Sequence, residues 1–281
     1  SLYGSIFIDN EKANKAIDGT TKKGENFASK LGGVFSKVGK GALALGGTLT
    51  TAATAIGGLA INTSKDVDQA MNSFIVQTGI AKNESGEWQK ALEDIYKNNY
   101  GESFEDIANS MALASQELYE FDPSQIKAVT ENALALRDAF GVEVNESIRA
   151  TKALMTQFGI SADEAYNLMA QGAQAGLDFS GELVDNINEY SVQFGKLGLS
   201  AEDMFNIFQS GADAGAWNLD KIGDAVKEFS IRAIDGSKTT VEGFTKLGLN
   251  ADTMAKKFAA GGDTAKEAFY QTIDAIKAMD D

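Results

Sequence analysis

The side chains that could do chemistry in this sequence are carboxylates and amines, because the chain has 40 Asp and Glu, 25 Lys and Arg, no His and no Cys. The commonest general base and the thiolate metal ligand are therefore both missing. Among this many acids in a helical protein, some carboxylates are neighbours by chance. Pairs of carboxylates alone therefore do not indicate a glycosidase. We expect no enzyme, no cofactor and no metal site. A catalytic centre would need acids gathered around Arg137, Arg149 or Arg232, the only arginines.

One glycine-rich stretch, GGVFSKVGKGA at residues 32–42, has the composition of a phosphate-binding loop. Its spacing is wrong, because five residues separate Gly33 from Gly39 where the motif has four. Its chemistry is also wrong, because Gly41 follows Lys40 where a hydroxyl is needed to bind Mg²⁺. No nucleotide site is predicted here.

Charge is distributed unevenly along the chain. Residues 1–65 contain eight lysines and four acidic residues, a net charge of +4, and since the whole chain carries −15, the remainder carries −19. Such an acidic body repels phosphate backbones, so direct nucleic-acid binding by it is not expected. The lysine-rich part leads into the most apolar stretch of the sequence, and this pairing suggests contact with a membrane.

That apolar stretch, GALALGGTLTTAATAIGGLAINTS, covers Gly41–Ser64 and has 24 residues without a charge. As a helix it would extend about 36 Å, enough to cross the roughly 30 Å hydrocarbon core of a bilayer. Several of its small residues are four positions apart, which permits close helix–helix packing. It is only weakly apolar, since threonines and glycines offset its leucines and isoleucines. Three interpretations stay open: conditional membrane insertion, a helix packed against copies of itself or a sheath, and a flexible hinge.

The rest of the sequence predicts an all-α fold with one short N-terminal strand. Only SLYGSIFID has the alternation of a strand, and a lysine-rich helical region follows at Asn10–Lys40. Beyond Lys65, apolar residues recur at intervals of three and four, typical of one buried helix face. In FDPSQI, Asp122 is expected to cap a helix that starts at Pro123. We expect a strand with a lysine-rich helix, an uncharged helix and an acidic helical-hairpin domain, at residues 1–40, 41–64 and 65–281, the last with a sub-boundary near 140–160.

One phrase occurs three times, as FGISADEAYNLMAQGAQAG, LGLSAEDMFNIFQSGADAG and the weaker LGLNADTMAKKFAAGGDTA, at residues 158–176, 197–215 and 247–265. In each copy a glycine is expected to end one helix in the left-handed conformation, and a residue two positions on to cap the next. The glycines and caps are Gly159 and Ser161, Gly198 and Ser200, and Gly248 and Asn250. The small residues of GAQAG and GADAG are expected where helices approach closely or end.

These copies predict helical hairpins of about forty residues that form a bundle or a solenoid, because one hairpin cannot cover its own apolar face. YGESFEDIANSMALASQEL, at residues 100–118, is a candidate for an earlier and more diverged copy. Caps and glycines at helix ends are scaffolding in most proteins. The repetition therefore indicates an architecture and not a ligand site.

In this order, the features resemble the N-terminal core region of tail tape measure proteins from tailed bacteriophages and related phage-tail-like particles. Four features carry the resemblance: the opening strand with its lysine-rich helix, SKVGKGALALGGTLTTAATAIGGLA, the acidic segment DVDQAMNSF, and the two most similar copies of the repeated phrase. They cover most of the chain, and their order is more specific than any one of them. Family members are commonly far longer, and their extended helical ruler and C-terminal hydrolase domain have no counterpart in this sequence.

The resemblance implies a structural virion protein that lies in the tail tube in a few copies, sets tail length during assembly and is expelled before the DNA. The implied partners are tail tube, distal tail or hub proteins, tail assembly chaperones, further copies of the chain in a homo-oligomer, and the host membrane on ejection. The implied location is the virion, after assembly in the bacterial cytoplasm. No catalytic residue is carried over from the family.

By the same resemblance, Gly41–Ser64 is the candidate membrane-inserting segment in genome delivery. Its inserting side chains would be Ala42, Leu43, Leu45, Leu49, Ile56, Leu59 and Ile61. The lysines at the membrane interface would be Lys22, Lys23, Lys30, Lys37 and Lys40.

A function of another class stays open beside this one. The chain could be a secreted, pore-forming effector whose acidic helical domain shields Gly41–Ser64 until it reaches a target membrane. The purified effector would by itself cause leakage of liposomes, whereas a tape measure protein would co-purify with tube or hub proteins.

The capped turns also limit what the chain can measure. In a single helix, 281 residues would reach about 420 Å, but each capped turn bends or reverses the chain. We therefore expect that residues 66–281 are not the measuring element while they are folded. Because the sequence opens with Ser1 and not with Met, we also expect a processed or ordered piece of a longer protein.

Overall fold

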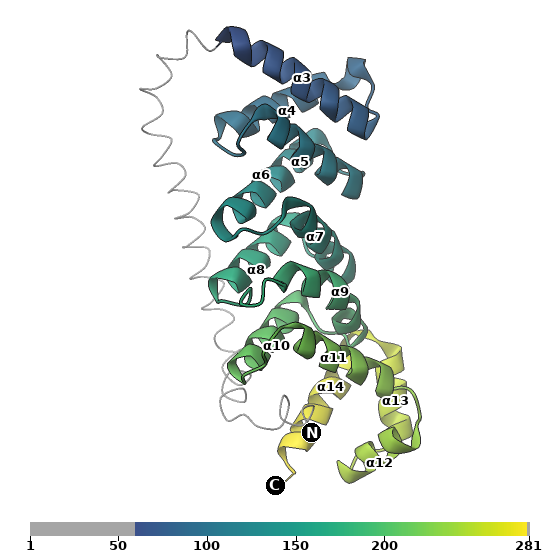
Figure 1. Ribbon diagram of the computed structural model, residues 1–281. Helices are drawn as coiled ribbons and strands as arrows, with labels where there is room; N and C mark the ends of the chain where they lie inside the picture. Colours follow the sequence, from purple (N-terminus) through teal and green to yellow (C-terminus); the bar gives the residue numbers. More distant parts are fainter. Residues whose placement is uncertain (1–59, 280–281) are drawn as a thin grey trace. The chain divides into compact units, whose positions relative to one another are not determined.

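The computed structural model of the chain describes residues 60–279 (Figure 1). These residues form twelve α-helices and one short 3₁₀ helix, and no strand lies among them. The all-α prediction is therefore confirmed for this part of the chain. The expected N-terminal strand, the lysine-rich helix and residues 41–59 lie outside the described residues. No helix within residues 60–279 combines the length and the apolar character needed to cross a bilayer.

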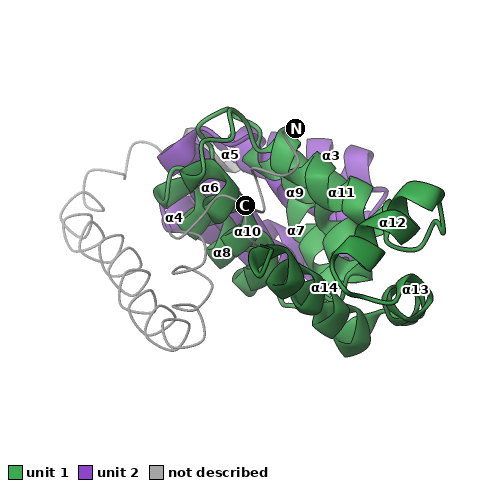
Figure 2. Ribbon diagram, turned by 90° about the horizontal axis from the view of Figure 1, so that it is seen from below, with its two compact units in different colours: residues 1–14, 149–281 green, residues 15–148 purple. Residues whose placement is uncertain are grey.

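The chain divides between Ile148 and Arg149 into two compact units, which Figure 2 draws in purple (unit 2) and green (unit 1). The described part of unit 2 is residues 60–148, and that of unit 1 is residues 149–279. Each unit has buried apolar residues of its own.

In unit 2, three helices bury one face each around α5. The elements are α3 (Ala60–Thr78), η2 (Lys82–Glu84), α4 (Gly86–Lys97), α5 (Phe104–Glu117), α6 (Pro123–Phe140) and the start of α7 (Val144–Phe158). Helix α3 lies along α5, and α4 and α6 pack on α5 and on each other. Phe74, Leu92 and Met111 are fully buried between them. The rings of Phe74 and Trp88 lie 5.2 Å apart and join α3 to α4.

The start of α6 shows how the local sequence determines a helix end. The Asp122 carboxylate accepts hydrogen bonds from the backbone N–H groups of Ser124 and Gln125, both at 2.9 Å. The Gln125 side chain in turn accepts from the Asp122 N–H at 3.0 Å. Pro123 occupies the first helical position, where its missing N–H costs no helical bond. The predicted N-cap is confirmed.

Unit 1 is built from helices that follow one another through short turns. After the rest of α7 come α8 (Ala162–Gln174), α9 (Leu183–Lys196), α10 (Ala201–Asp213), α11 (Asp220–Arg232), α12 (Lys238–Lys246), α13 (Ala251–Ala260) and α14 (Gly262–Lys277). Helix α10 packs on α8, α9 and α11, and α14 packs on α9 and α13. Phe194 of α9 and Phe208 of α10 are fully buried, with their rings edge to face at 5.6 Å.

Small residues of the repeated phrase lie where two helices cross closely. A Cβ atom added to Gly172 in α8 would come within 2.9 Å of the Phe205 ring in α10. One added to Gly211 in α10 would come within 2.5 Å of Ile222 in α11. The expectation that GAQAG and GADAG mark close helix contacts is therefore confirmed at these two glycines.

The third copy of the phrase departs from the period of about forty residues. The first two copies start 39 residues apart, at Phe158 and Leu197, but the third starts 50 residues after the second, at Leu247. Ser237 starts an additional helix in between, because its hydroxyl accepts from the Thr240 N–H at 3.3 Å. That helix, α12, has 9 residues, whereas α9 at the corresponding place has 14. The period of about forty residues thus holds between the first two copies, whose capped helices are α8 and α10, but not for the part of the chain that follows.

Candidate functional site

The three copies of the phrase form three turns that share a left-handed glycine and a capping residue. The glycines that end the first helix of each turn have left-handed φ angles of +68°, +71° and +71°, at Gly159, Gly198 and Gly248. In the second turn the Leu199 N–H donates to the Phe194 carbonyl at 3.1 Å, which closes the end of α9. The third turn repeats this bond from Leu249 to Phe244 at 2.8 Å.

The residue two positions after each glycine caps the following helix. Ser161 accepts from the Glu164 N–H at 3.2 Å, and its own N–H donates to the Glu164 carboxylate at 2.8 Å. Ser200 and Asp203 make the same pair of bonds at 3.1 and 2.8 Å. Asn250 accepts from the backbone N–H three residues on at 2.9 Å. These bonds hold helix ends together and leave no reactive group at the turn.

The second turn has an additional connection, because Asp203 is also bound by two side chains of α14. Lys266 Nζ lies 2.6 Å from its Oδ2 atom, and the Tyr270 hydroxyl donates to Oδ1 at 3.1 Å. Burial raises the Asp203 pKa, but the Lys266 ammonium and the Ser200 N–H more than offset this, so the pKa lies below its ordinary value. Burial and the Asp203 charge raise the pKa of Tyr270. Asp203 therefore joins the α9–α10 turn to α14.

We predict that Asp203→Asn lowers the free energy of unfolding at neutral pH by about 2 kcal/mol, since it removes charge-assisted hydrogen bonds. A lowered folded pKa means that the carboxylate stabilises the fold above its unfolded pKa and loses this effect as the pH falls through the folded pKa. The difference between wild type and variant should therefore shrink on acidification below about pH 4. Urea unfolding at several pH values measures it. Glu164→Gln, at the same capping position, is the control and should cost less.

A second polar cluster of unit 1 joins α9 to α11. The buried Tyr190 places its hydroxyl 2.7 Å from Asp220 Oδ1 and 3.0 Å from Asp224 Oδ1. Burial and these two carboxylates raise the pKa of Tyr190, so it stays a phenol and a donor. Its single hydrogen serves two acceptors, one helical turn apart on α11. The cluster fixes how α11 lies on α9.

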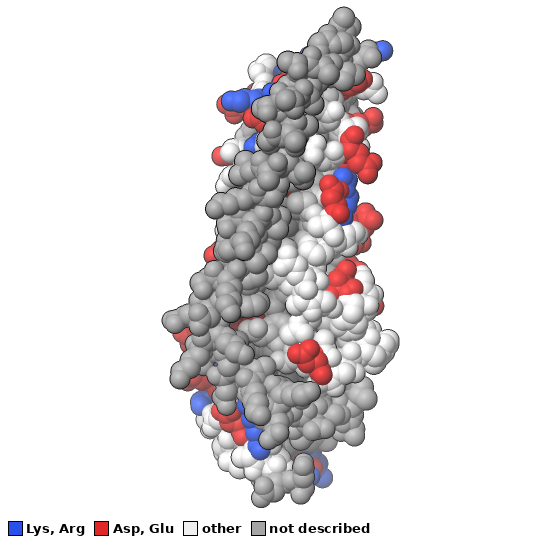
Figure 3. Space-filling view, turned by 90° about the vertical axis from the view of Figure 1, so that its left-hand side faces the viewer, with Lys and Arg blue, Asp and Glu red and all other residues white. Residues whose placement is uncertain are grey.

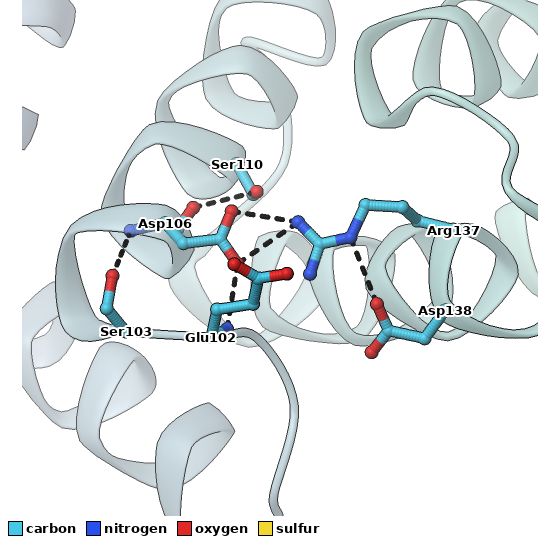
Figure 4. Close-up of polar contacts among 6 residues, drawn as sticks. All are labelled: Glu102, Ser103, Asp106, Ser110, Arg137 and Asp138. Atoms are coloured by element: carbon cyan, nitrogen blue, oxygen red, sulfur yellow. Dashed lines mark hydrogen bonds and ion pairs between the residues drawn. The ribbon is translucent and has the colours of Figure 1, made fainter.

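Unit 2 has a corresponding ion pair between α5 and α6, which Figure 4 shows in detail. Arg137 Nη1 donates to both carboxylate oxygens of Asp106, at 2.8 and 3.1 Å, and its Nε donates to Asp138 at 3.0 Å. Ser103 caps α5 by accepting from the Asp106 N–H at 3.1 Å, and the Glu102 N–H donates to Asp106 at 2.9 Å. Burial raises the Asp106 pKa, but the Arg137 guanidinium and the Glu102 N–H lower it by more. The pKa therefore lies below its ordinary value, and the acid stays charged.

Unit 1 also has an open groove of about 440 Å³ between α11, α12 and α14. Arg232 at its rim pairs with Glu228 at 3.1 Å and lies one residue from the exposed Ile231. The lining contains no acidic residue, so this arginine has no carboxylate partner inside the groove. The lining residues are Phe229, Arg232, Ala233, Thr239, Thr240, Gly243, Phe244, Leu247, Thr272 and Ile276.

The described residues offer little catalytic or metal-binding chemistry. Across residues 60–279, no group of three or more acids is placed to hold a metal ion. Arg137 lies in a helix-to-helix ion pair, Arg232 faces an apolar groove, and Arg149 is exposed. Figure 3 shows acidic side chains scattered over one face, with fewer basic ones between them.

The structure describes only part of the residues that the sequence singled out. The six glycines and caps of the repeated phrase lie at helix ends in unit 1, as described above. Ile61 belongs to α3, but its side chain is not described. The five interfacial lysines and the other inserting residues, Ala42, Leu43, Leu45, Leu49, Ile56 and Leu59, lie outside the described residues.

Sequence reasoning missed the long-range partners and two exposed aromatic residues. Lys266 is 63 residues from Asp203, and no local pattern connects them. Phe179 and Trp217 had a weak signal, because each is the first aromatic residue after the small-residue end of a repeated phrase, in GLDFSGE and GAWNLDK. Comparing the copies beyond residues 176 and 215 would have found them.

Within residues 60–279, the fold and the polar clusters together define an all-helical body whose charged groups hold helices in place. The chain belongs to the family described as phage-related minor tail protein, whose model matches residues 96–281. It is also 38% identical over 65 residues to a probable tape measure protein of Streptomyces phage phiC31, a match that covers 23% of this chain and 9% of that protein. No solved structure matches the chain.

Membership of this family assigns the chain to phage tails. It supports a structural and non-enzymatic role, and a place in the virion. The chain spans only a small part of the length of the relative it matches, 9% of it. What the whole protein does is therefore a matter for proposal.

Proposed function

We propose that the chain is part of a tail tape measure protein, which acts in tail assembly and length determination and in genome delivery across the host membrane. The family match over residues 96–281 carries the proposal. The identity shared with a probable tape measure protein supports it further. So does the order of a basic segment, an uncharged stretch and an acidic helical body along the sequence. The family match favours this function over that of a secreted pore-forming effector.

Within that function, the described residues act as a folded body and not as the ruler. The longest described helix, α3, has 19 residues and a length of about 28 Å. Residues 60–279 in a single helix would instead reach about 330 Å. The capped turns of unit 1 reverse the chain and prevent such a rod. This part of the protein therefore sits at a tube end or in a tip complex, or it unfolds to pass through the tube.

The uncharged stretch at Gly41–Ser64 is the part we assign to the host membrane during ejection. Its length and lack of charge support this, and so do the five interfacial lysines that precede it. The same proposal includes a few copies of the chain that associate with each other and with tube, distal tail or hub proteins. Assembly chaperones bind the chain before it enters the tail.

An amber mutation in the gene for the chain tests the proposal in its own phage. We expect particles without tails of defined length under non-suppressing conditions, and normal tails when the wild-type gene is supplied in trans. Electron microscopy of negatively stained particles measures tail length. Tails of normal length without the protein would refute a role in length determination. Crosslinks spread evenly between unit 1 and the whole lumen wall would refute the placement at a tube end.

A further inference from the structure

Two turns of unit 1, the α8–α9 turn and the α10–α11 turn, each expose one aromatic side chain. Phe179, in the turn between α8 and α9, is 49% exposed, and Trp217, in the turn between α10 and α11, is 69% exposed. Both follow the small-residue end of the repeated phrase, so they occupy corresponding places in two repeats. Aromatic side chains contribute strongly to protein interfaces, so their repeated exposure indicates a binding surface.

The turn that carries Phe179 is held at both ends. The Leu177 N–H donates to the Gly172 carbonyl at 2.9 Å, and the Leu177 side chain is buried. On the other side, the Leu183 N–H donates to the Asp178 carboxylate at 3.0 Å. Phe179 therefore projects from a turn that is fixed by its neighbours.

The turn that carries Trp217 is held in the same way. The Ala216 N–H donates to the Gly211 carbonyl at 3.0 Å, which corresponds to the bond from Leu177 to Gly172 in the α8–α9 turn. Asn218 accepts from the Lys221 N–H at 3.2 Å, and Leu219 is fully buried. Both rings are thus displayed by ordered backbone, which reduces the entropy lost when a partner binds.

Both turns lie at the same edge of unit 1. Helices α8 and α10 pack against each other, and Figure 1 shows both of them ending at the edge where these turns lie. We call this surface the aromatic edge and define it as residues 174–188 and 213–221. A ligand that runs along this edge could contact both rings.

The aromatic edge is acidic. Residues 174–188 contain three acids and no base, and residues 213–221 contain two acids and one lysine, so the edge carries a net charge of −4. The single lysine, Lys221, places its Nζ 5.8 Å from the centre of the Trp217 ring. That contact shows the ring accepting a cation on its face. The surface therefore suits an occupant with several lysines and apolar side chains between them.

We propose that the aromatic edge binds the lysine-rich segment of this same chain, residues 22–40, from its own or a neighbouring copy. This segment contains five lysines and one acid, a net charge of +4 that matches the edge. Phe27, Leu31 and Phe35 are spaced by four, so a helix would present them on one side. These apolar groups contact Phe179 and Trp217, while the lysines lie on the carboxylates. The inference does not depend on the proposed function.

A photo-crosslinker at position 217 in the full chain tests the proposal. Trp217→p-benzoylphenylalanine should crosslink to residues 22–40, as identified by mass spectrometry of the digested protein. Trp217 is mostly exposed, so the substitution leaves the core intact. The control is Ile231→p-benzoylphenylalanine, an exposed position in the same unit at the far end of α11, which should not capture this segment. Mixing isotopically labelled and unlabelled chains separates binding within one copy from binding between copies.

Replacing the five lysines of the segment by glutamine in the crosslinker variant gives the second arm. In this glutamine variant the yield of the crosslink should fall about fivefold. With the lysines intact, the yield of the crosslink should fall by a similar factor when the NaCl concentration rises from about 0.05 to about 0.5 M. Circular dichroism checks that every variant is folded. Crosslinks that avoid residues 22–40, or that persist undiminished in the glutamine variant, would overturn the proposal.

Discussion

Gly198→Ala should lower the free energy of unfolding of unit 1 by about 3 kcal/mol, the sum of backbone strain and overpacking. Gly198 has a φ of +71°, which costs any residue with a Cβ atom. A Cβ atom there would also overlap the carbonyl group of Gly262, the first residue of α14. Backbone atoms of a helix end cannot move aside alone. The substitution should therefore push α14 away and weaken the contact between Lys266 and Asp203.

The matched control is Gly159→Ala in the first copy of the same turn. Its φ is +68°, and no atom lies within 4 Å of the place that a Cβ would take. It should cost only the backbone strain, about 1 kcal/mol. Urea unfolding followed by circular dichroism measures both variants. Equal losses for the two variants would show that α14 does not bear on the α9–α10 turn.

These two glycines also show what the sequence can and cannot predict. A glycine followed two residues later by a serine is a local signal, because left-handed φ and capping both depend on neighbouring residues. The positions of the turns could therefore be read from the sequence. The contact between Gly198 and Gly262 could not, because only tertiary packing brings together residues that are 64 positions apart. Lys266 and Tyr270 were missed for the same reason.

The interruption in the repeat shows a second limit. Residues 247–265 match the earlier copies well enough to predict the same hairpin, but α12 is shorter than α9. The sequence does contain a signal for the start of the additional helix α12. Gly236 and Ser237 form a glycine-and-cap pair like those of the repeated phrase, with the cap directly after the glycine. The membrane-insertion hypothesis differs in kind. It concerns residues 41–64, of which 41–59 lie outside the described part of the chain, and so it stays a prediction.

Gly223→Ala should destabilise unit 1 by about 2 kcal/mol, although alanine is the better helix former. Gly223 lies in α11, and a Cβ atom added to it would overlap the ring of Tyr190 in α9. Tyr190 is 1% exposed, and its hydroxyl is bound to Asp220 and Asp224 on the same helix as Gly223. The ring is therefore held from both sides and cannot turn away, so the two helices must separate.

The control for this substitution is Gly243→Ala in α12, where no atom lies within 4 Å of the added Cβ. It should stabilise the protein by about 0.5–1 kcal/mol, the helical preference of alanine over glycine. A double-mutant cycle with Tyr190→Leu then isolates the contact. If the ring causes the loss, Gly223→Ala should cost at least 1 kcal/mol less in the leucine background, a coupling typical of residues in direct contact. An unchanged cost would mean that α9 and α11 are not held apart by this ring.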